Sequence, residues 1–202
     1  MKLRKSYRAY LTQHLTPARL QHSIGVMRLM QDLAELYDLD LDRALTAGLL
    51  HDVAKNLSPE ELLILAERGG ITFAYPCEQI PMYLHGPVGA YLIQTELGVT
   101  DPVVVDAIRM HTSHGKVAEG QRRFAWCLRL ADILAPIKPW PGMKKLKRKV
   151  YTGHFEEAKL LLSAWVIEYF QASDIPVHPN FRQNVAQISS RLQIGPGFYE
   201  RE

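Results

Sequence analysis

The sequence predicts an all-α protein, a helical bundle of about eight or nine elements, from three observations. Between His22 and Leu36, the side chains of one face recur at spacings of 4, 3, 4 and 3 residues, which is a helical period. Capping residues followed by proline mark several helix starts. No stretch shows the strict alternation of a strand, and the chain contains no internal repeat.

In the first half of the chain, caps and breakers bound the expected helices. Thr16-Pro17 and Ser58-Pro59 each supply an N-cap and a first helical residue. Residues 71–83 carry two prolines and no clear period, which predicts a loop with a short turn. Gly86-Pro87 opens the next helix and leaves His85 just ahead of its first turn. The helices expected here cover about residues 17–37, 42–54, 59–69 and 86–97.

In the second half, Asp101-Pro102 opens a helix that places Val104, Ile108 and His111 on one stripe. Three prolines between Ala135 and Gly142 end a later helix. We therefore expect a core over residues 1–135 and a helical C-terminal part over 136–202 that packs on it, together as one structural domain. The remaining helices are expected over about 122–134, over the basic run 144–149, and over 155–171 and 181–193.

Composition excludes several classes of protein. No apolar run approaches the ~18 residues that span a bilayer, so no membrane partner is expected. The net charge of +3 is too small to indicate nucleic acid, and the basic run of 144–149 is interpreted first as a solvated helix face. The two cysteines, Cys77 and Cys127, have no metal-type spacing, and no signal peptide is evident, so a cytoplasmic protein is expected.

The stretch GLLHDVAKN, residues 48–56, places His51, Asp52 and Lys55 among apolar neighbours. A His-Asp pair alone is a weak signal, because a single histidine on an apolar face is usually a hydrogen-bonded core residue. The whole set is stronger, since a buried unpaired carboxylate is costly and a divalent metal would neutralise it. The set, each at an inward or helix-start position, consists of His22, His51, Asp52, His85, His111 and Asp132.

This donor set favours iron, manganese, zinc, cobalt or nickel over magnesium and calcium, which prefer oxygen ligands only. Adjacent helical residues point about 100° apart, so His51 and Asp52 diverge around a metal, and Asp52 can bridge two ions. Lys55 lies on their side of the helix. The small residues Ala44, Ala47 and Gly48 leave room for neighbouring helices to approach closely.

The pattern His22, His51-Asp52 and Asp132 resembles the HD-domain metal-dependent phosphohydrolase superfamily. The segments LLHDVAK, LHGPVGAYL, IRMHT, LADILAP and IPVHPN are similar, in this order, to the YqeK-like family of bacterial symmetrical bis(5′-nucleosyl)-tetraphosphatases. That family hydrolyses diadenosine tetraphosphate to two ADP. The resemblance, over about residues 3 to 190, implies an all-α HD domain and a bound iron centre of one or two ions, with manganese, cobalt or zinc as alternatives.

The resemblance also implies roles for single residues. His22, His51, Asp52 and Asp132 would hold one metal, and His85 and His111 a second, with Asp52 bridging. Arg19, Lys55 and Arg109 would meet phosphate oxygens and act in catalysis, and Thr112 would hydrogen-bond a phosphate. Lys138 takes the place of a family arginine near the second nucleotide, and His178 either contacts substrate or fixes its own loop.

The chain departs from the family after Asp132, where Ile133, Ala135 and Lys138 stand in place of a Tyr, a Glu and an Arg. Two other functions therefore stay open: hydrolysis of a different nucleotide, and non-catalytic nucleotide sensing by a metal-binding HD module. The expected partner is a small nucleotide substrate, and the sequence leaves a homodimer open. Association with nucleic acid through the basic run is a third, weaker alternative.

Overall fold

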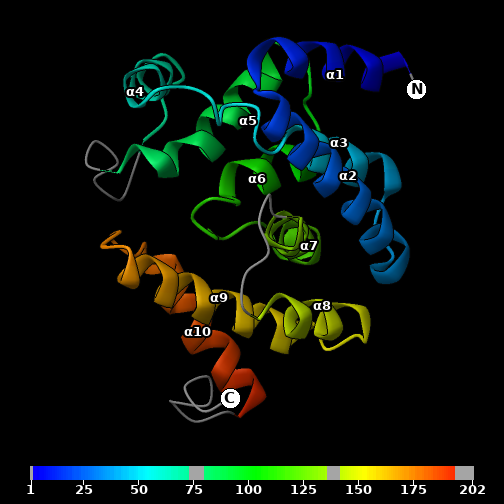
Figure 1. The fold of residues 1–202 in the computed structure, drawn as a ribbon, viewed down its shortest axis with the longest axis vertical. Helices are drawn as coiled ribbons and strands as arrows, with labels where there is room; N and C mark the ends of the chain where they lie inside the picture. Colours follow the sequence, from blue (N-terminus) through cyan, green and yellow to red (C-terminus); the bar gives the residue numbers. More distant parts are fainter. Residues whose placement is uncertain (1, 73–79, 136–141, 194–202) are drawn as a thin grey trace. The chain divides into compact units, whose positions relative to one another are not determined.

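A computed structural model of the chain describes residues 2–72, 80–135 and 142–193, and all regular structure in these ranges is helical (Figure 1). The predicted all-α fold class is confirmed. The chain divides into two compact units, residues 1–137 and 138–202. The boundary expected at residue 135, and the packing of both parts as one domain, stay predictions.

The first unit contains seven α-helices and two 3₁₀ helices among its described residues. In chain order they are α1 (Lys2–His14), α2 (Pro17–Tyr37), α3 (Leu41–Leu50), α4 (Pro59–Arg68), η1 (Pro81–Leu84), α5 (His85–Thr95), α6 (Pro102–Met110), η2 (Glu119–Gln121) and α7 (Arg122–Leu134).

The predicted helix starts are confirmed by their caps. The Thr16 hydroxyl accepts a hydrogen bond from the Arg19 backbone N–H at the start of α2. At α4, Ser58 and Glu61 form a capping box, in which each side chain accepts from the backbone N–H of the other residue. These bonds satisfy N–H groups that a helix leaves unpaired at its first turn.

The core of the first unit is built around α3. This helix packs on α2, α6 and α7, while α5 packs on α6 and α4. Leu50, Ile108 and Leu128 are fully buried where these helices meet. Each such side chain contributes about 1.5–3 kcal/mol to stability by leaving water. The helices that carry the predicted metal ligands are thus held against one another by apolar contacts.

The structure differs from the expected helices in three places. The helix expected over 42–54 ends at Leu50, and residues 51–56 continue in turns with bonds such as Lys55 N–H to the Asp52 carbonyl, 2.9 Å. These bonds join residues three apart in sequence, as in a 3₁₀ turn, so the backbone that carries His51 and Asp52 is wound more tightly than an α-helix. The sequence also gave no prediction for α1, since only scattered apolar residues such as Tyr7 and Leu11 mark its buried face. His85, expected just before α5, is its first residue.

The second unit consists, among its described residues, of α8 (Met143–Tyr151), α9 (Phe155–Ala172) and α10 (Pro179–Leu192). Helix α9 packs on both α8 and α10, and the rings of Phe170 and Phe181 meet edge to face at 5.7 Å. On α8, Leu146 and Val150 are buried, whereas Lys144, Lys147 and Arg148 are exposed. The basic run therefore forms the outer face of an amphipathic helix.

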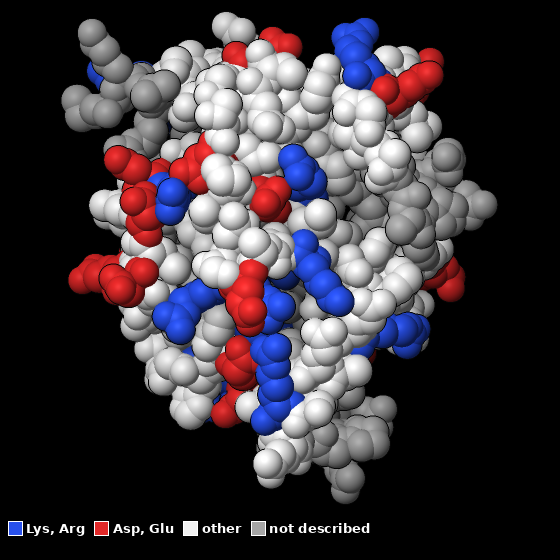
Figure 2. All heavy atoms as spheres, turned by 180° about the vertical axis from the view of Figure 1, so that it is seen from behind, with Lys and Arg blue, Asp and Glu red and all other residues white. Residues whose placement is uncertain are grey.

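Charges of both signs are interspersed on the face of the molecule drawn in Figure 2. This mixture agrees with a net charge of only +3. Among the described helices, none combines the length and apolar character needed to cross a membrane.

Candidate functional site: two ligand groups that share Asp52

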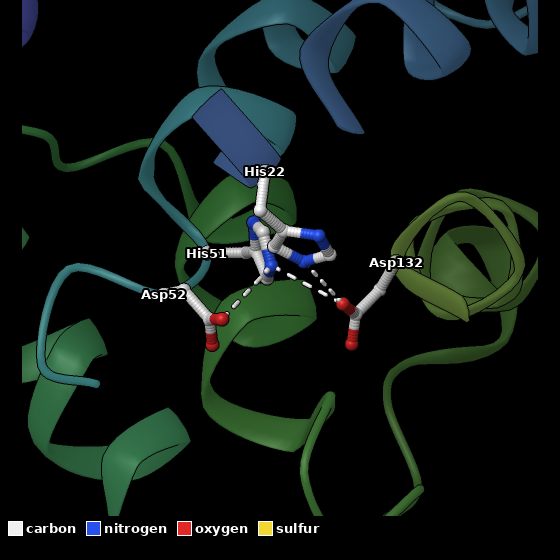
Figure 3. Close-up of side chains that lie close together, drawn as sticks. All are labelled: His22, His51, Asp52 and Asp132. Atoms are coloured by element: carbon white, nitrogen blue, oxygen red, sulfur yellow. Dashed lines mark hydrogen bonds and ion pairs between the residues drawn. The ribbon is translucent and has the colours of Figure 1, made fainter. Parts of the chain in front are cut away.

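Four predicted residues form a first ligand group, to which α2, α7 and the turn after α3 contribute (Figure 3). His22 Nε2 lies 3.0 Å from Asp132 Oδ1, and His51 Nε2 lies 3.4 Å from the same oxygen. His51 Nε2 also lies 3.6 Å from Asp52 Oδ2. The four ligand atoms all lie within 4.8 Å of one another, close enough for the group to hold one ion.

A second ligand group consists of Asp52, His85 and His111, all buried. Asp52 Oδ1 lies 3.3 Å from His85 Nε2 and 3.5 Å from His111 Nε2. The two imidazole Nε2 atoms are 3.2 Å apart. Since the two carboxylate oxygens of Asp52 face different groups, this side chain stands between the two halves of the site.

The imidazoles of both groups share one orientation. Each Nδ1 lies at hydrogen-bonding distance from a backbone carbonyl, so in the neutral ring Nδ1 carries the hydrogen and Nε2 presents its lone pair to the cluster. The pairs are His22 with Ala135, His51 with Gly48 at 3.0 Å, His85 with Met82 at 2.5 Å, and His111 with Ile108 at 2.7 Å.

These donors fit a divalent metal. The Nε2 lone pairs of His85 and His111 face each other, an arrangement that a shared proton or a cation between them would relieve. His51 Nε2 and Asp52 Oδ1 are buried without a hydrogen-bond partner, a costly arrangement unless an ion binds them. Imidazole nitrogens mixed with carboxylate oxygens match iron, manganese, cobalt and zinc.

The electrostatics of the two groups differ. Burial lowers the pKa of the His51 imidazole, but the carboxylates of Asp52 and Asp132 raise it further, to about 9. Burial also lowers the pKa of His85, and the charge of Lys55 lowers it more, to about 4. The first group therefore attracts positive charge strongly, whereas the second already has an ammonium beside it, with Lys55 Nζ 2.9 Å from His85 Nε2.

Burial raises the pKa of the Asp52 carboxyl, but His51 and then Lys55 more than offset this, so the pKa stays well below its usual range. Burial likewise raises the pKa of Asp132, but the hydrogen bond with His22 and the close approach of His51 hold it well below its usual range. Both carboxylates are thus ionised at neutral pH, as metal ligands must be.

Glycines allow the helices to approach closely at each group. A Cβ at Gly48 would lie 2.7 Å from the Met27 Cα on α2, so only glycine fits the α2–α3 contact behind His22 and His51. A Cβ at Gly86 would lie 2.9 Å from Thr112 Oγ1 and 3.0 Å from the Arg109 carbonyl oxygen. The expectation that Gly48 permits a close approach is confirmed.

A cleft of about 460 Å³ opens beside the second group. Arg19 and Lys55 stand at its wall, where the Arg19 guanidinium donates to the Lys55 carbonyl at 2.7 Å. The sequence missed most of its lining, because the residues come from α4 and from the stretch expected as a loop, where no pattern signals a pocket. The further lining residues are Leu57, Pro59, Leu62, Ile80, Pro81, Met82 and His85.

The other predicted substrate residues occupy different settings. Arg109, on α6, pairs with Asp106 at 3.0 Å, and its side chain is 40% exposed. Thr112 donates its hydroxyl hydrogen to the Tyr83 carbonyl at 2.9 Å, so a bond to phosphate would have to replace this one. His178 belongs to the second unit, where its Nδ1 accepts from the Asn180 N–H at the start of α10, the kind of bond that the loop-fixing alternative expects; both alternatives for His178 stay predictions. Lys138 lies outside the described residues.

Several known proteins resemble this chain in sequence. The family model of the HD domain matches residues 19–137. A protein of Bacillus subtilis named symmetrical bis(5′-nucleosyl)-tetraphosphatase is 35% identical over 172 residues, covering 85% of this chain and 90% of the relative. A protein of Halalkalibacterium halodurans with the same name is 35% identical over 143 residues, covering 69% and 72%.

A solved structure gives a further comparison. It comes from Clostridium acetobutylicum and is described as a predicted HD superfamily hydrolase involved in NAD metabolism. It superposes with a TM-score of 0.85 at 26% identity, covering 93% of this chain and 97% of the other.

Proposed function

Since the chain belongs to the HD-domain phosphohydrolases, in the family of symmetrical bis(5′-nucleosyl)-tetraphosphatases, we propose that it hydrolyses diadenosine tetraphosphate to two ADP. The observation that carries the proposal is the convergence of two ligand groups on Asp52, next to a cleft with Arg19 and Lys55 at its wall. Two divalent ions held by these groups, with two cationic side chains beside a cavity, would suit a polyphosphate, which brings several negative charges to one place.

The proposed ligands are His22, His51, Asp52 and Asp132 for one divalent ion, and Asp52, His85 and His111 for a second. We propose iron as the resident metal, with manganese, cobalt or zinc as alternatives. A divalent ion bound there supplies Lewis-acid chemistry, because it lowers the pKa of water towards neutrality and neutralises charge on phosphoryl oxygens. The protein contributes fixed imidazoles, oriented by their Nδ1 hydrogen bonds to backbone carbonyls.

The cleft is proposed to bind one nucleoside of the substrate. Its volume of about 460 Å³ lies in the range of small-molecule sites and suits one half of a dinucleoside polyphosphate. Apolar side chains such as Leu57, Leu62 and Ile80 would contact the base and exclude water from it. At the end nearest His85, Lys55 and Arg19 would bind the phosphates of that half.

The reaction adds one water across the central phosphoanhydride bond. The water oxygen bonds to one phosphorus, the bond from that phosphorus to the bridging oxygen breaks, and one ADP leaves with the bridging oxygen; the second ADP keeps the water oxygen, whose protons pass to solvent. Lys55 Nζ and the Arg19 guanidinium would donate hydrogen bonds to phosphoryl oxygens, whose charge grows during the displacement. Arg109 is proposed to do the same after leaving its exposed pair with Asp106.

Product analysis tests the proposal. The purified protein, loaded with Fe²⁺ under reducing conditions, is incubated with diadenosine tetraphosphate, and the nucleotides are separated by ion exchange. ADP as the sole product supports the proposal, provided that an Asp52→Ala variant purified in parallel yields none. ATP plus AMP overturns symmetrical cleavage. Bound metal without any product would favour another nucleotide substrate or a nucleotide sensor.

The cytoplasmic setting and the homodimer stay predictions.

A further inference from the structure

Arg129 is a buried cation on α7 that the proposed chemistry does not use. It lies between Leu128 and Leu130 and is only 4% exposed. Its guanidinium contacts two carbonyl oxygens and the ring of Trp126, and it has no carboxylate partner within the described part of the chain. Burial lowers the pKa of Arg129 to about 9. A buried charge without a counter-ion is costly, so its contacts must supply a compensating benefit.

Those contacts hold both ends of one short loop. Arg129 Nη2 donates to the Met110 carbonyl at 3.2 Å and to the Gly115 carbonyl at 2.6 Å. Met110 is the last residue of α6, where helical carbonyls lack partners and a positive charge is favourable. The four residues between these carbonyls begin with His111, a proposed ligand of the second group.

The loop is turned so that it can reach Arg129. His114 has a φ of 51°, in the left-handed region, and this turn directs the chain back towards α7. The buried His114 ring meets the Trp126 ring edge to face at 5.4 Å, and the Arg129 guanidinium lies 4.8 Å from the centre of the same ring. Arg129 and Trp126 together therefore fix residues 110–115 against α7.

We propose that Arg129 is a positioning residue for His111. By holding the carbonyls on both sides of the loop, it keeps His111 Nε2 at 3.2 Å from His85 Nε2 and at 3.5 Å from Asp52 Oδ1. Helix α7 then serves both halves of the site, since it carries Asp132 for the first group and the anchor for the second. The inference rests on the proposed metal-dependent function.

Cobalt binding tests this role without any substrate. Metal-free protein is titrated with Co²⁺ by calorimetry and by visible absorption. Replacing Arg129 by Met removes both hydrogen bonds, and we expect the Co²⁺ affinity to fall about 10- to 100-fold, as for other residues that orient metal ligands. In Arg129→Lys the side chain keeps its charge but is shorter and lacks the planar group over Trp126. The Co²⁺ affinity of this variant should therefore lie between those of wild type and Arg129→Met. Arg123→Met, at an exposed position of the same helix, is the matched control and should bind as wild type.

A double-mutant cycle separates positioning from general stability. If Arg129 acts through His111, Arg129→Lys should have no further effect on Co²⁺ affinity in a His111→Ala background, but its full effect in a His51→Ala background. An equal loss in both backgrounds overturns the proposal. So does wild-type affinity in Arg129→Lys with only a lower melting temperature. Because Co²⁺ binding requires no nucleotide, a wrong substrate assignment would leave this result unchanged.

Discussion

The two ligand groups share one carboxylate but differ in charge and in exposure. The first group adds Asp132, whose side chain is 33% exposed, to Asp52, whereas the second has, among the described residues, no carboxylate besides Asp52, and its three members are buried. The pKa of His51 is raised to about 9 and that of His85 is lowered to about 4. The electrostatic potential at the two imidazoles thus has opposite sign, because His51 faces two carboxylates and His85 faces an ammonium.

This difference suggests that the groups have different tasks. The first is suited to hold a cation tightly, since it brings two carboxylates together and their field already favours a positive charge on His51. The second lies against the cleft and has Lys55 beside it, so a cation there competes with a charge that the protein itself supplies. We expect the second group to bind metal more weakly than the first, and its metal affinity to depend more on bound substrate.

The largest effect is expected at the shared residue. Asp52→Ala should remove metal and activity together, with a fall in kcat of at least about 1,000-fold, because both groups lose a ligand. Metal content by mass spectrometry, together with the hydrolysis rate, checks this. Full metal content with normal turnover would show that the two groups do not meet at Asp52.

A smaller effect is expected at Lys55. Lys55→Met should lower kcat by about 100-fold, because a phosphate contact is lost. It should leave metal binding equal or tighter, because a competing positive charge disappears. Lys116→Met, at an exposed loop position, is the control. Loss of metal from the Lys55 variant would instead give this lysine a structural role.

The groups should also separate in metal affinity. His51→Gln should lower the affinity for the more tightly bound Co²⁺ ion about 10- to 100-fold. His85→Gln should lower the affinity for the more weakly bound ion by a similar factor. Isothermal titration of both variants measures the two affinities. If both substitutions lower the affinity for the same Co²⁺ ion, the cluster binds a single ion and the distinction between the groups is wrong.

The glycine contacts offer a test through packing. Gly48→Ala should cost about 1–3 kcal/mol of stability and disturb the first group, because its Cβ meets the backbone of α2. Gly86→Ala should disturb the second group instead. Gly120→Ala is the matched control, since no atom lies within 4 Å of the added Cβ. Thermal unfolding and Co²⁺ titration together would show whether each substitution affects one group alone.

The smallest effect is on the pH dependence of stability in metal-free protein. His51 has a folded pKa of about 9, above its unfolded value of ~6.5, so its contribution is present below pH ~6.5 and is lost as the pH rises to about 9. His85 has a folded pKa of about 4, so stability is lost as the pH falls from ~6.5 towards 4. The melting temperature is measured as a function of pH for wild type and both variants. His51→Gln should reduce its fall at high pH by a few degrees, and His85→Gln should reduce its fall at low pH by a similar amount. If both substitutions changed the melting temperature in the same pH range, the opposite pKa shifts of His51 and His85 would be contradicted.

Much of the site was predictable because its chemistry is unusual for its surroundings. Asp132 lies in an apolar helix, and Thr16-Pro17 and Ser58-Pro59 mark helix starts by local bonding alone. The six proposed ligands lie in the two groups that the resemblance implied. The turn after Leu50 was missed, because His51-Asp52 continues a helical pattern and only packing decides where the helix stops.

The sequence by itself determined the all-α class, most helix limits and the residue types of the site, because these depend on period, capping and side-chain chemistry. Tertiary structure alone decided the approach of α2 to α3 at Gly48, the cleft beside α4, and the attachment of the His111 loop to Arg129. Those features depend on which side chains from distant segments meet. A one-dimensional pattern carries no distance between segments, whereas close packing fixes that distance to within a few tenths of an ångström.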